Sequence, residues 1–266
     1  MRVRQLVSHR QRIGGFLGYW AKSLVRNLDS PFVRQIDSSL TVAFVVGCGH
    51  SGTTLLAAKI GLLQGCYVPG WETGLFLPIN GLHAGRQGLD FLLRMTSHCG
   101  ASVLVEKTPK HVFCAARIRR VFPSAKFLVT TRNPLDSCAS LYRRFGNLEF
   151  AVERWNMDNK AALDILSSEN SMRVAYEDLV SIPSQQLAEV AQFLGLPFDD
   201  KILDASTTVF TQEAADPIMA IRAKQVAGPI APRVGTWRDE LSSSQVDFVL
   251  AETESIASRL GFHKSV

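Results

Sequence analysis

The stretch TVAFVVGCGHSGTTLLAAKI, residues 41–60, combines a strand, a glycine-containing loop and a helix. Residues 41–46 are β-branched or apolar, which is typical of a buried strand. A helical pattern begins inside the loop at Thr53, and we expect it to continue to residue 64. A loop of this kind offers backbone N–H groups and the positive end of the helix dipole, and both suit a phosphate.

Further strands and helices alternate along the chain. We expect strands at 103–105 and 125–132, a strand over 172–179 that runs into an acidic turn, and helices at 111–122, 136–145, 183–195 and 242–262. This alternation predicts a single α/β domain whose mostly parallel sheet is flanked by helices. Ligands of such sheets bind beyond the carboxyl ends of the strands. Residues 206–232 have weaker periodicity, and we interpret them as a lid or loop over the site.

Composition narrows the class of protein. The 266 residues are 46% hydrophobic and 20% charged, which fits one large globular domain. The net charge of +5 suggests an anionic ligand without requiring nucleic acid as a partner. The five cysteines are scattered, odd in number and without a CxxC pair, which favours a reducing compartment and neither a zinc site nor a disulfide framework. We therefore expect a cytoplasmic protein.

The domain, 40–266, follows a basic arm, 1–39. Six Lys and Arg residues precede Asp29, the first acid, and apolar residues recur near helical spacing. One interpretation is that residues 1–28 form an amphipathic helix at the surface of an anionic membrane. A helix packed on its own domain is favoured over this, because three glycines weaken an isolated helix. A role of the arm in homodimerisation is a third interpretation.

The loop resembles a nucleotide-binding loop without its lysine. Gly47 and Gly52 have the spacing of GxxxxGK[ST], and Thr54 occupies the final hydroxyl position, but Thr53 stands where lysine is usual. Since no metal-binding aspartate is evident on a neighbouring strand, the sequence gives little support for chemistry at a γ-phosphate. A kinase-like nucleotide-binding enzyme is therefore the alternative, not the main hypothesis.

A second candidate anion site lies in TTRNPLDSCASLY, residues 130–142. Arg132 follows a predicted strand and can hold a phosphate through two parallel hydrogen bonds. Asn133 and Pro134 make the turn, and Ser140 lies on the following helix, where its hydroxyl can reach the same anion.

These motifs together resemble those of the sulfotransferase family, with glycan and tyrosylprotein members closest in pattern. HSGTT, 50–54, resembles the 5′-phosphosulfate loop, in which Arg or Lys usually precedes SGTT, and Arg132 with Ser140 resembles the 3′-phosphate motif. VEKTP, 105–109, and YEDL, 176–179, are also similar to family segments. The resemblance, from about Val42 to Leu241, implies a P-loop-like fold. It also implies transfer of a sulfuryl group from 3′-phosphoadenosine 5′-phosphosulfate (PAPS) to an acceptor, without a metal, to leave adenosine 3′,5′-bisphosphate (PAP).

The resemblance also implies roles for individual residues. Glu72 is the implied general base, with His111 as the alternative, and Lys107 is the implied donor to the charge that builds on the bridging oxygen. His50 is assigned both to the reaction and to donor binding. The full set of implied donor-binding residues is Gly49, His50, Ser51, Gly52, Thr53, Thr54, Arg132, Ser140, Tyr176, Arg233 and Trp237. For Trp237 the alternative is that the ring caps the core.

His50 departs from the family pattern, because an imidazole is only partly charged at neutral pH. Either a bound dianion raises its pKa, or it donates a neutral hydrogen bond while Lys107 carries the charge. The implied acceptor is a carbohydrate or glycolipid hydroxyl, with protein tyrosine or a small molecule as alternatives, and segments 73–100 and 143–170 are expected to line its cleft. A catalytically idle, nucleotide-binding member of the family is the remaining hypothesis.

Overall fold

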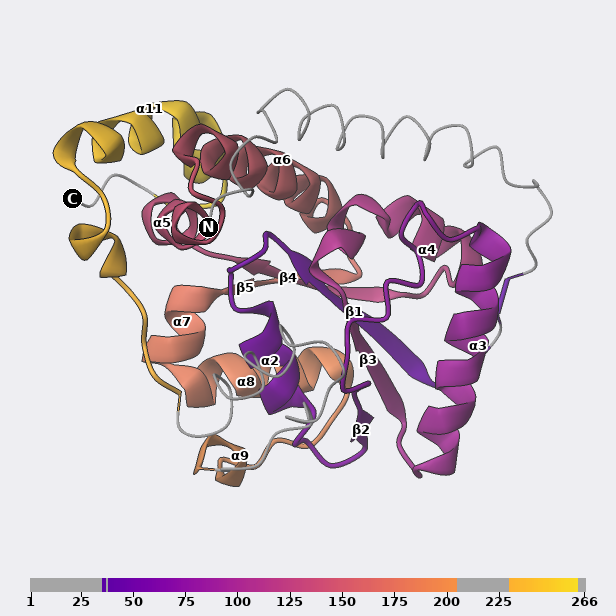
Figure 1. Cartoon of the computed structure of the whole chain (residues 1–266). Helices are drawn as coiled ribbons and strands as arrows, with labels where there is room; N and C mark the ends of the chain where they lie inside the picture. The colour runs from indigo at the N-terminus through magenta and orange to yellow at the C-terminus, as the bar shows by residue number, and fades with distance from the viewer. Residues whose placement is uncertain (1–34, 37, 205–229, 263–266) are drawn as a thin grey trace, which may run out of the picture.

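A central strand with both faces buried organises the protein. The computed structural model describes residues 35–36, 38–204 and 230–262. Its five strands form one parallel sheet in the order β2-β3-β1-β4-β5 (Figure 1). Their bounds are β1 Thr41–Gly47, β2 Cys66–Tyr67, β3 Val103–Lys107, β4 Lys126–Thr131 and β5 Ser171–Ala175. The connections run to one side after β1 and to the other after β4, and in such sheets ligands bind between these two strands at their carboxyl ends.

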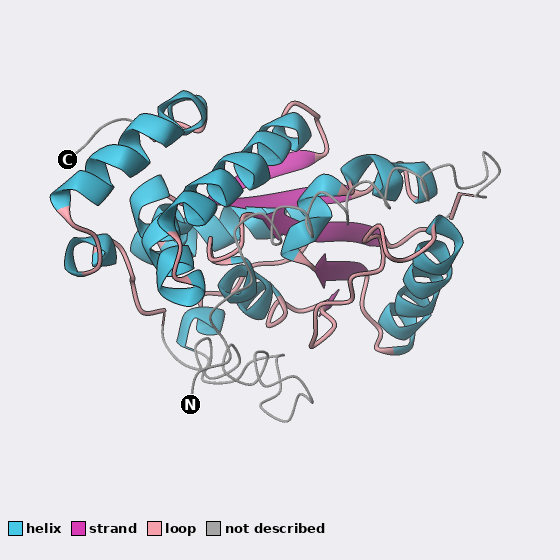
Figure 2. Ribbon diagram, turned by 45° about the horizontal axis from the view of Figure 1, so that its top comes forward, coloured by secondary structure: helices cyan, strands magenta, loops and turns pink. Residues whose placement is uncertain are grey.

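Side chains of β1 alternate between two hydrophobic clusters. Val42, Phe44 and Val46 belong to one cluster, whereas Ala43 and Val45 belong to the other. Helices α2 (Thr53–Ile60) and α8 (Pro183–Leu194) cover the face of Ala43 and Val45. Helices α3 (Leu82–His98), α4 (Ala115–Val121) and α6 (Leu148–Leu166) cover the opposite face (Figure 2). Successive side chains of a strand point to opposite faces of the sheet. Because helices cover both faces, nearly every residue of β1 is apolar.

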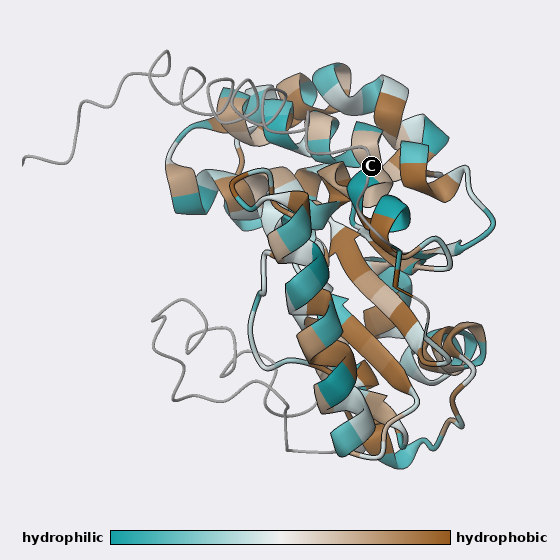
Figure 3. Cartoon of the chain, turned by 90° about the vertical axis from the view of Figure 1, so that its right-hand side faces the viewer, coloured by the Kyte–Doolittle hydropathy of each residue, from teal (hydrophilic) through white to brown (hydrophobic). Residues whose placement is uncertain are grey.

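A third cluster joins helices to one another. The N-terminal half of α6 packs there with α5 (Pro134–Phe145) and α11 (Ser243–Arg259). The remaining short elements are η1 Pro109–Phe113, α7 Tyr176–Ser181, α9 Lys201–Asp204 and η2 Thr236–Asp239. Figure 3 shows the apolar strands, drawn in brown, between helices that are polar on their outer sides.

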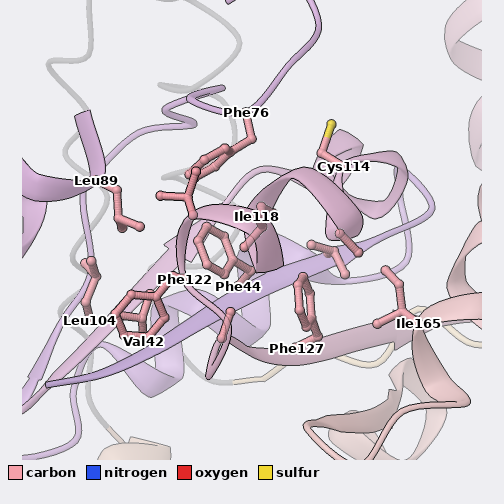
Figure 4. Packing of buried hydrophobic residues seen from close by; sticks show 14 of the residues in the cluster. Val42, Phe44, Phe76, Leu89, Leu104, Cys114, Ile118, Phe122, Phe127 and Ile165 are labelled. Carbon is pink, nitrogen blue, oxygen red and sulfur yellow. The ribbon is translucent and has the colours of Figure 1, made fainter. Parts of the chain in front are cut away.

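Aromatic rings fill the cluster beneath α4 (Figure 4). The ring centroid of Phe44 lies 5.8 Å from that of Phe127 and 5.9 Å from that of Phe76, and all three side chains are fully buried. Burial of each ring stabilises the fold by about 1.5–3 kcal/mol. The cluster fixes Phe76, and with it the segment that follows β2.

Local signals set several helix boundaries as the sequence predicts. Asn133 caps α5 by accepting a hydrogen bond from the Asp136 backbone N–H, and Pro134 occupies the first turn. Ser242 and Gln245 form a capping box at the start of α11. The predicted α/β fold with a parallel sheet is therefore confirmed, and the helices at 136–145, 183–195 and 242–262 lie within a few residues of their predicted bounds.

Three expectations on secondary structure were wrong. The helix predicted at 111–122 is divided into η1 and α4, and the helix predicted to end at residue 64 ends at Ile60. YEDL, 176–179, is helical in α7 instead of extended, because acidic residues in a first turn are stabilised by the helix dipole. Helices α3 and α6 were not predicted.

Two predicted segments lie wholly or largely outside the described residues. These are the basic arm, apart from residues 35–36 and 38–39, and the proposed lid, of which only residues 230–232 are described. Within the described part of the chain, no helix is both long enough and apolar enough to cross a membrane.

Candidate active site

The residues selected from the sequence gather at one edge of the sheet. Parallel strands end on the same side, so β1 leads into the loop of residues 48–52, β3 ends at Lys107, and β4 is followed directly by Arg132. Register places Lys107 opposite Val45 and Thr130 opposite Gly47. The loop therefore has the ends of β3 and β4 as its two neighbours.

Backbone conformation shapes this loop. Gly47 and Gly52 have φ angles of 142° and 88°, in the region that favours glycine. A Cβ on Gly52 would lie 2.7 Å from the Tyr176 ring, and one on Gly47 would lie 2.3 Å from the Thr130 carbonyl oxygen. Both glycines of the predicted motif are thus required by conformation and by close packing.

Ser51 holds the loop together from inside. Its hydroxyl lies 2.5 Å from the Cys48 carbonyl oxygen, to which it donates, and 2.8 Å from the Thr130 hydroxyl. Its backbone N–H donates to the Cys48 oxygen as well, at 3.2 Å. Ser51 was predicted to bind the donor, but its side chain is buried and its hydrogen bonds shape the loop.

The start of α2 leaves backbone donors for an anion. Gly52 stands at the N-cap position in a left-handed conformation, and no side-chain capping bond forms there among the described residues. The first N–H groups of a helix have no acceptor within the helix. Thr53 is buried and Thr54 is half-buried in this first turn, which contains no acidic residue. This is the arrangement that binds phosphate or sulfate.

Arg132 lies against the loop and is almost fully buried. Its Nη1 donates to the His50 carbonyl oxygen at 3.1 Å, and its Nη2 donates to the Arg233 carbonyl oxygen. The guanidinium carbon lies 4.3 Å from the centre of the Tyr176 ring. The buried Nε has no hydrogen-bond partner in the described part of the chain. A buried, unpartnered donor is costly and is explained if an anion binds there.

His50 is turned toward the same group of residues. Its Nδ1 lies 2.8 Å from the Ser140 hydroxyl, and its φ of 71° is unusual for a residue other than glycine. His50 and Ser140 were assigned to opposite ends of the nucleotide, yet the structure brings them into contact. The imidazole thus belongs at least in part to the Arg132–Ser140 side of the site.

Tyr176 and Arg233 complete this side. The Tyr176 ring is buried between Gly52 and the Arg132 guanidinium, and its hydroxyl accepts a hydrogen bond from the Arg233 backbone N–H at 3.2 Å. The Arg233 side chain is exposed. The half-buried ring of Trp237 packs against the cluster of α5, α6 and α11, which agrees with the alternative that this ring caps the core.

Glu72 and Lys107 meet on the other side of the loop. The Lys107 Nζ donates to Glu72 Oε1 at 2.9 Å. The Lys107 side chain is fully buried, whereas 31% of the Glu72 side chain is exposed. The two residues selected as base and electrophilic donor therefore form one ion pair, with its carboxylate accessible and its ammonium enclosed.

A buried carboxylate that the sequence analysis did not select fixes the Glu72 segment. Glu106 Oε1 accepts from the hydroxyls of Thr73 at 2.7 Å and Thr108 at 2.6 Å, and Oε2 lies 2.9 Å from His111 Nδ1. Burial alone would raise the pKa of Glu106, but the His111 contact and these hydrogen bonds outweigh it, and the pKa is lowered.

His111 is consequently excluded as the base. Its Nε2 accepts a hydrogen bond from the Phe76 backbone N–H at 3.1 Å, and its Nδ1 faces Glu106. The side chain is fully buried, so no acceptor can reach it. The alternative assignment of His111 was wrong. It rested on the position of His111 shortly after Lys107 in the sequence, and that position does not reveal that the side chain is buried.

Two aspartates were also missed. Asp136 is buried and accepts hydrogen bonds from the backbone N–H groups of Gly235 and Trp237, at 2.9 and 3.2 Å, which fastens the C-terminal segment to α5. Asp158 of α6 accepts from the Cys48 thiol and the Gly49 N–H and lies beside Arg154. Burial raises the pKa of Asp158, although Arg154 and these hydrogen bonds oppose the shift. The acid three residues after Asn133 is a sequence signal for Asp136; Asp158 gave none.

The sequences to which this chain is similar are all sulfotransferases. The model of the sulfotransferase family matches residues 85–200. Protein-tyrosine sulfotransferase A of Caenorhabditis elegans is 28% identical over 111 residues, which cover 38% of this chain and 29% of that protein. Protein-tyrosine sulfotransferase 1 of Danio rerio is 24% identical over 212 residues, which cover 67% and 59%. The matched regions thus span less than two thirds of either relative.

Solved structures share the fold. The sulfotransferase domain of the Synechococcus PCC 7002 olefin synthase superimposes with a TM-score of 0.67 at 18% identity, covering 87% of this chain and 99% of that one. Mouse sulfotransferase SULT7A1, solved in complex with PAP, gives 0.53 at 12% identity, with 86% and 91% covered. At such identities the likeness concerns the arrangement of helices and strands.

Proposed function

We propose that the chain is a member of the sulfotransferase family and that it transfers a sulfuryl group from PAPS to an acceptor hydroxyl, with Glu72 as general base. The observation that carries the proposal is the pair of cations beside the glycine loop. Lys107 ends the strand on one side of β1 and Arg132 follows the strand on the other. A donor with a phosphosulfate at one end and a 3′-phosphate at the other needs two separate anion sites, and this edge of the sheet offers two.

The residues on the Arg132 side suit the 3′-phosphate. The unpartnered Nε of Arg132, the Ser140 hydroxyl and the His50 ring lie together there. The loop amides and the start of α2 suit the 5′ end. The complex of mouse SULT7A1 with PAP supports this choice of nucleotide, since that protein has the same fold.

The transfer then needs a base and a donor to the leaving group. Glu72 takes the proton of the acceptor hydroxyl. The acceptor oxygen bonds to sulfur, and the bond between sulfur and the bridging oxygen of PAPS breaks. The electron pair of that bond stays on the 5′-phosphate of PAP. Lys107 donates to this oxygen as its charge develops. An ammonium has three donors, so Lys107 can make this contact while it remains paired with Glu72.

For the acceptor we propose several classes of hydroxyl compound. The accessible carboxylate of Glu72 suits a hydroxyl of a sugar, a glycolipid or a small molecule. The names of the two curated relatives support protein tyrosine as a further acceptor for this chain.

Two measurements test the function. Calorimetry should detect binding of PAP without magnesium and weaker or no binding of ATP with magnesium. Incubation with PAPS labelled in its sulfate should transfer label to at least one member of a panel containing a tyrosyl peptide, a glycan and a phenol. Preference for ATP with magnesium would favour a kinase-like enzyme, and binding of PAP without transfer to any acceptor would favour a catalytically idle protein.

A further inference from the structure

The glycine loop carries no permanent positive charge of its own. From Gly47 to Thr54 the only basic residue is His50. The first lysine of α2, Lys59, is buried and donates to the carbonyl oxygens of Ile202 and Leu203, both at 3.3 Å. A fixed cation for the 5′ end of a donor must therefore come from another part of the chain.

Arg154 of α6 lies directly against this loop. Its Nη2 is 3.1 Å from the position that a Cβ on Gly49 would occupy. Glycine at residue 49 thus leaves the space that the guanidinium approaches. Segment 143–170 was expected only to line the acceptor cleft, yet its helix α6 brings an arginine to the phosphate loop from about a hundred residues away in the sequence.

Asp158 holds both partners of this contact. The Arg154 Nε lies 3.4 Å from Asp158 Oδ2, and the same carboxyl group accepts from the Gly49 N–H and the Cys48 thiol. The guanidinium carbon also lies 5.9 Å from the centre of the Phe145 ring. One buried carboxyl group therefore fixes the loop backbone and the arginine relative to each other.

The charge on Arg154 also acts toward the Glu72 side of the site. Burial lowers the pKa of Lys110, the positive charge of Arg154 lowers it further, and Asp158 and Glu72 oppose the shift. Arg154 is thus close enough to Lys110 for their charges to interact.

We propose that Arg154 binds the 5′-phosphosulfate end of the donor and supplies, from α6, the fixed cation that the loop lacks at residue 50. The proposal rests on the proposed function. It gives His50 a consistent place as well, since the imidazole is turned toward Ser140 and the other phosphate. Guanidinium groups bind phosphate and sulfate oxygens through two hydrogen bonds, which a lysine cannot reproduce.

Two nucleotides separate a contact at the 5′ end from a general loss of structure. We expect Arg154→Gln to weaken binding of PAP by about 10- to 100-fold, the usual loss for one charge-assisted hydrogen bond. Its affinity for adenosine 3′-monophosphate, which has no 5′-phosphate, should equal that of the wild type. Lys160→Gln is the matched control, because it removes a cation from an exposed position of the same helix.

A conservative variant sharpens the test. Arg154→Lys should keep part of the PAP affinity that Arg154→Gln loses, since a positive charge stays on α6 beside Gly49. Unchanged PAP binding in Arg154→Gln, or equal losses for both nucleotides, would overturn the proposal while the wild type still binds PAP. If the wild type does not bind PAP, the proposed function itself fails, and this inference fails with it.

Discussion

The two sides of the glycine loop are held in place by different means. On the Arg132 side, backbone conformation, an aromatic ring and hydrogen bonds to carbonyl oxygens fix a buried guanidinium. One of its donors has no partner among the residues that the structure describes. On the Glu72 side, the buried carboxylate of Glu106 collects hydroxyl and imidazole contacts and leaves the neighbouring Glu72 accessible.

The difference fits the role that we propose for each side. A phosphate site needs hydrogen-bond donors that are held in place but are not already bonded to an acceptor within the protein. Backbone N–H groups meet this need with the least loss of conformational freedom. A general base needs an accessible carboxylate, so the anchoring falls to a second carboxylate that is kept from solvent. Variants of the two sides should therefore fail in different measurements.

The largest effect is expected on the Glu72 side. Glu72→Gln should lower kcat by about 10²- to 10⁴-fold, the contribution of a general base, because the amide cannot take a proton. Affinity for PAP should not change, as measured by calorimetry. Glu252→Gln, an exposed change on α11, is the control. Wild-type kcat in Glu72→Gln would assign the base to another residue.

On the Arg132 side the deficit should appear in binding. Arg132→Gln should weaken PAP by about 10- to 100-fold, since a charge-assisted contact with the 3′-phosphate is lost. Affinity for adenosine 5′-monophosphate, without that phosphate, should fall much less. The exposed Arg94→Gln is the control. If both nucleotides lose affinity equally, Arg132 supports the loop and does not contact the 3′-phosphate.

Glu106→Gln should combine a loss of stability with a change in its pH dependence. Losing the charged acceptor of a buried network should lower the free energy of unfolding by about 1.5–3 kcal/mol, measured with urea. The pKa of Glu106 is lowered in the folded state, so its stabilisation is complete above the ordinary value of 4.5 and is lost as the pH falls toward the folded value.

The variant should therefore show a shallower decline of stability in acid than the wild type. Asp90→Asn, which removes an exposed carboxylate paired with Arg94, should change stability by less than about 0.5 kcal/mol. An acid profile of Glu106→Gln that parallels the wild type would contradict a lowered pKa for Glu106.

The smallest effect is expected for His50→Arg. This variant should retain activity and extend it to higher pH, because a guanidinium stays charged where an imidazole is neutral. The pH profile of kcat/KM is the measurement, and Lys160→Gln is again a suitable control. Loss of all activity with PAP affinity intact would show that the imidazole has a role that charge cannot replace.

Much of the fold could be predicted because its signals are local. The buried run of β1, the glycine spacing of the loop and the cap formed by Asn133 each depend on residues close together in the chain. For the same reason, a loop at the end of β1 and an arginine at the end of β4 could be assigned to one edge of the sheet. Helices α3 and α6 could not be predicted, since their bounds depend on the surfaces they cover.

The sequence by itself determined the parallel sheet, the glycine loop and the positions of Glu72, Lys107, Arg132 and Ser140 at the ends of strands or on the elements that follow. Only the tertiary structure decided that His111 is buried against Glu106, that His50 contacts Ser140, and that Arg154 reaches Gly49 from α6. The physical reason is that periodicity reports which face of an element is apolar, whereas burial and contact depend on how distant elements pack together.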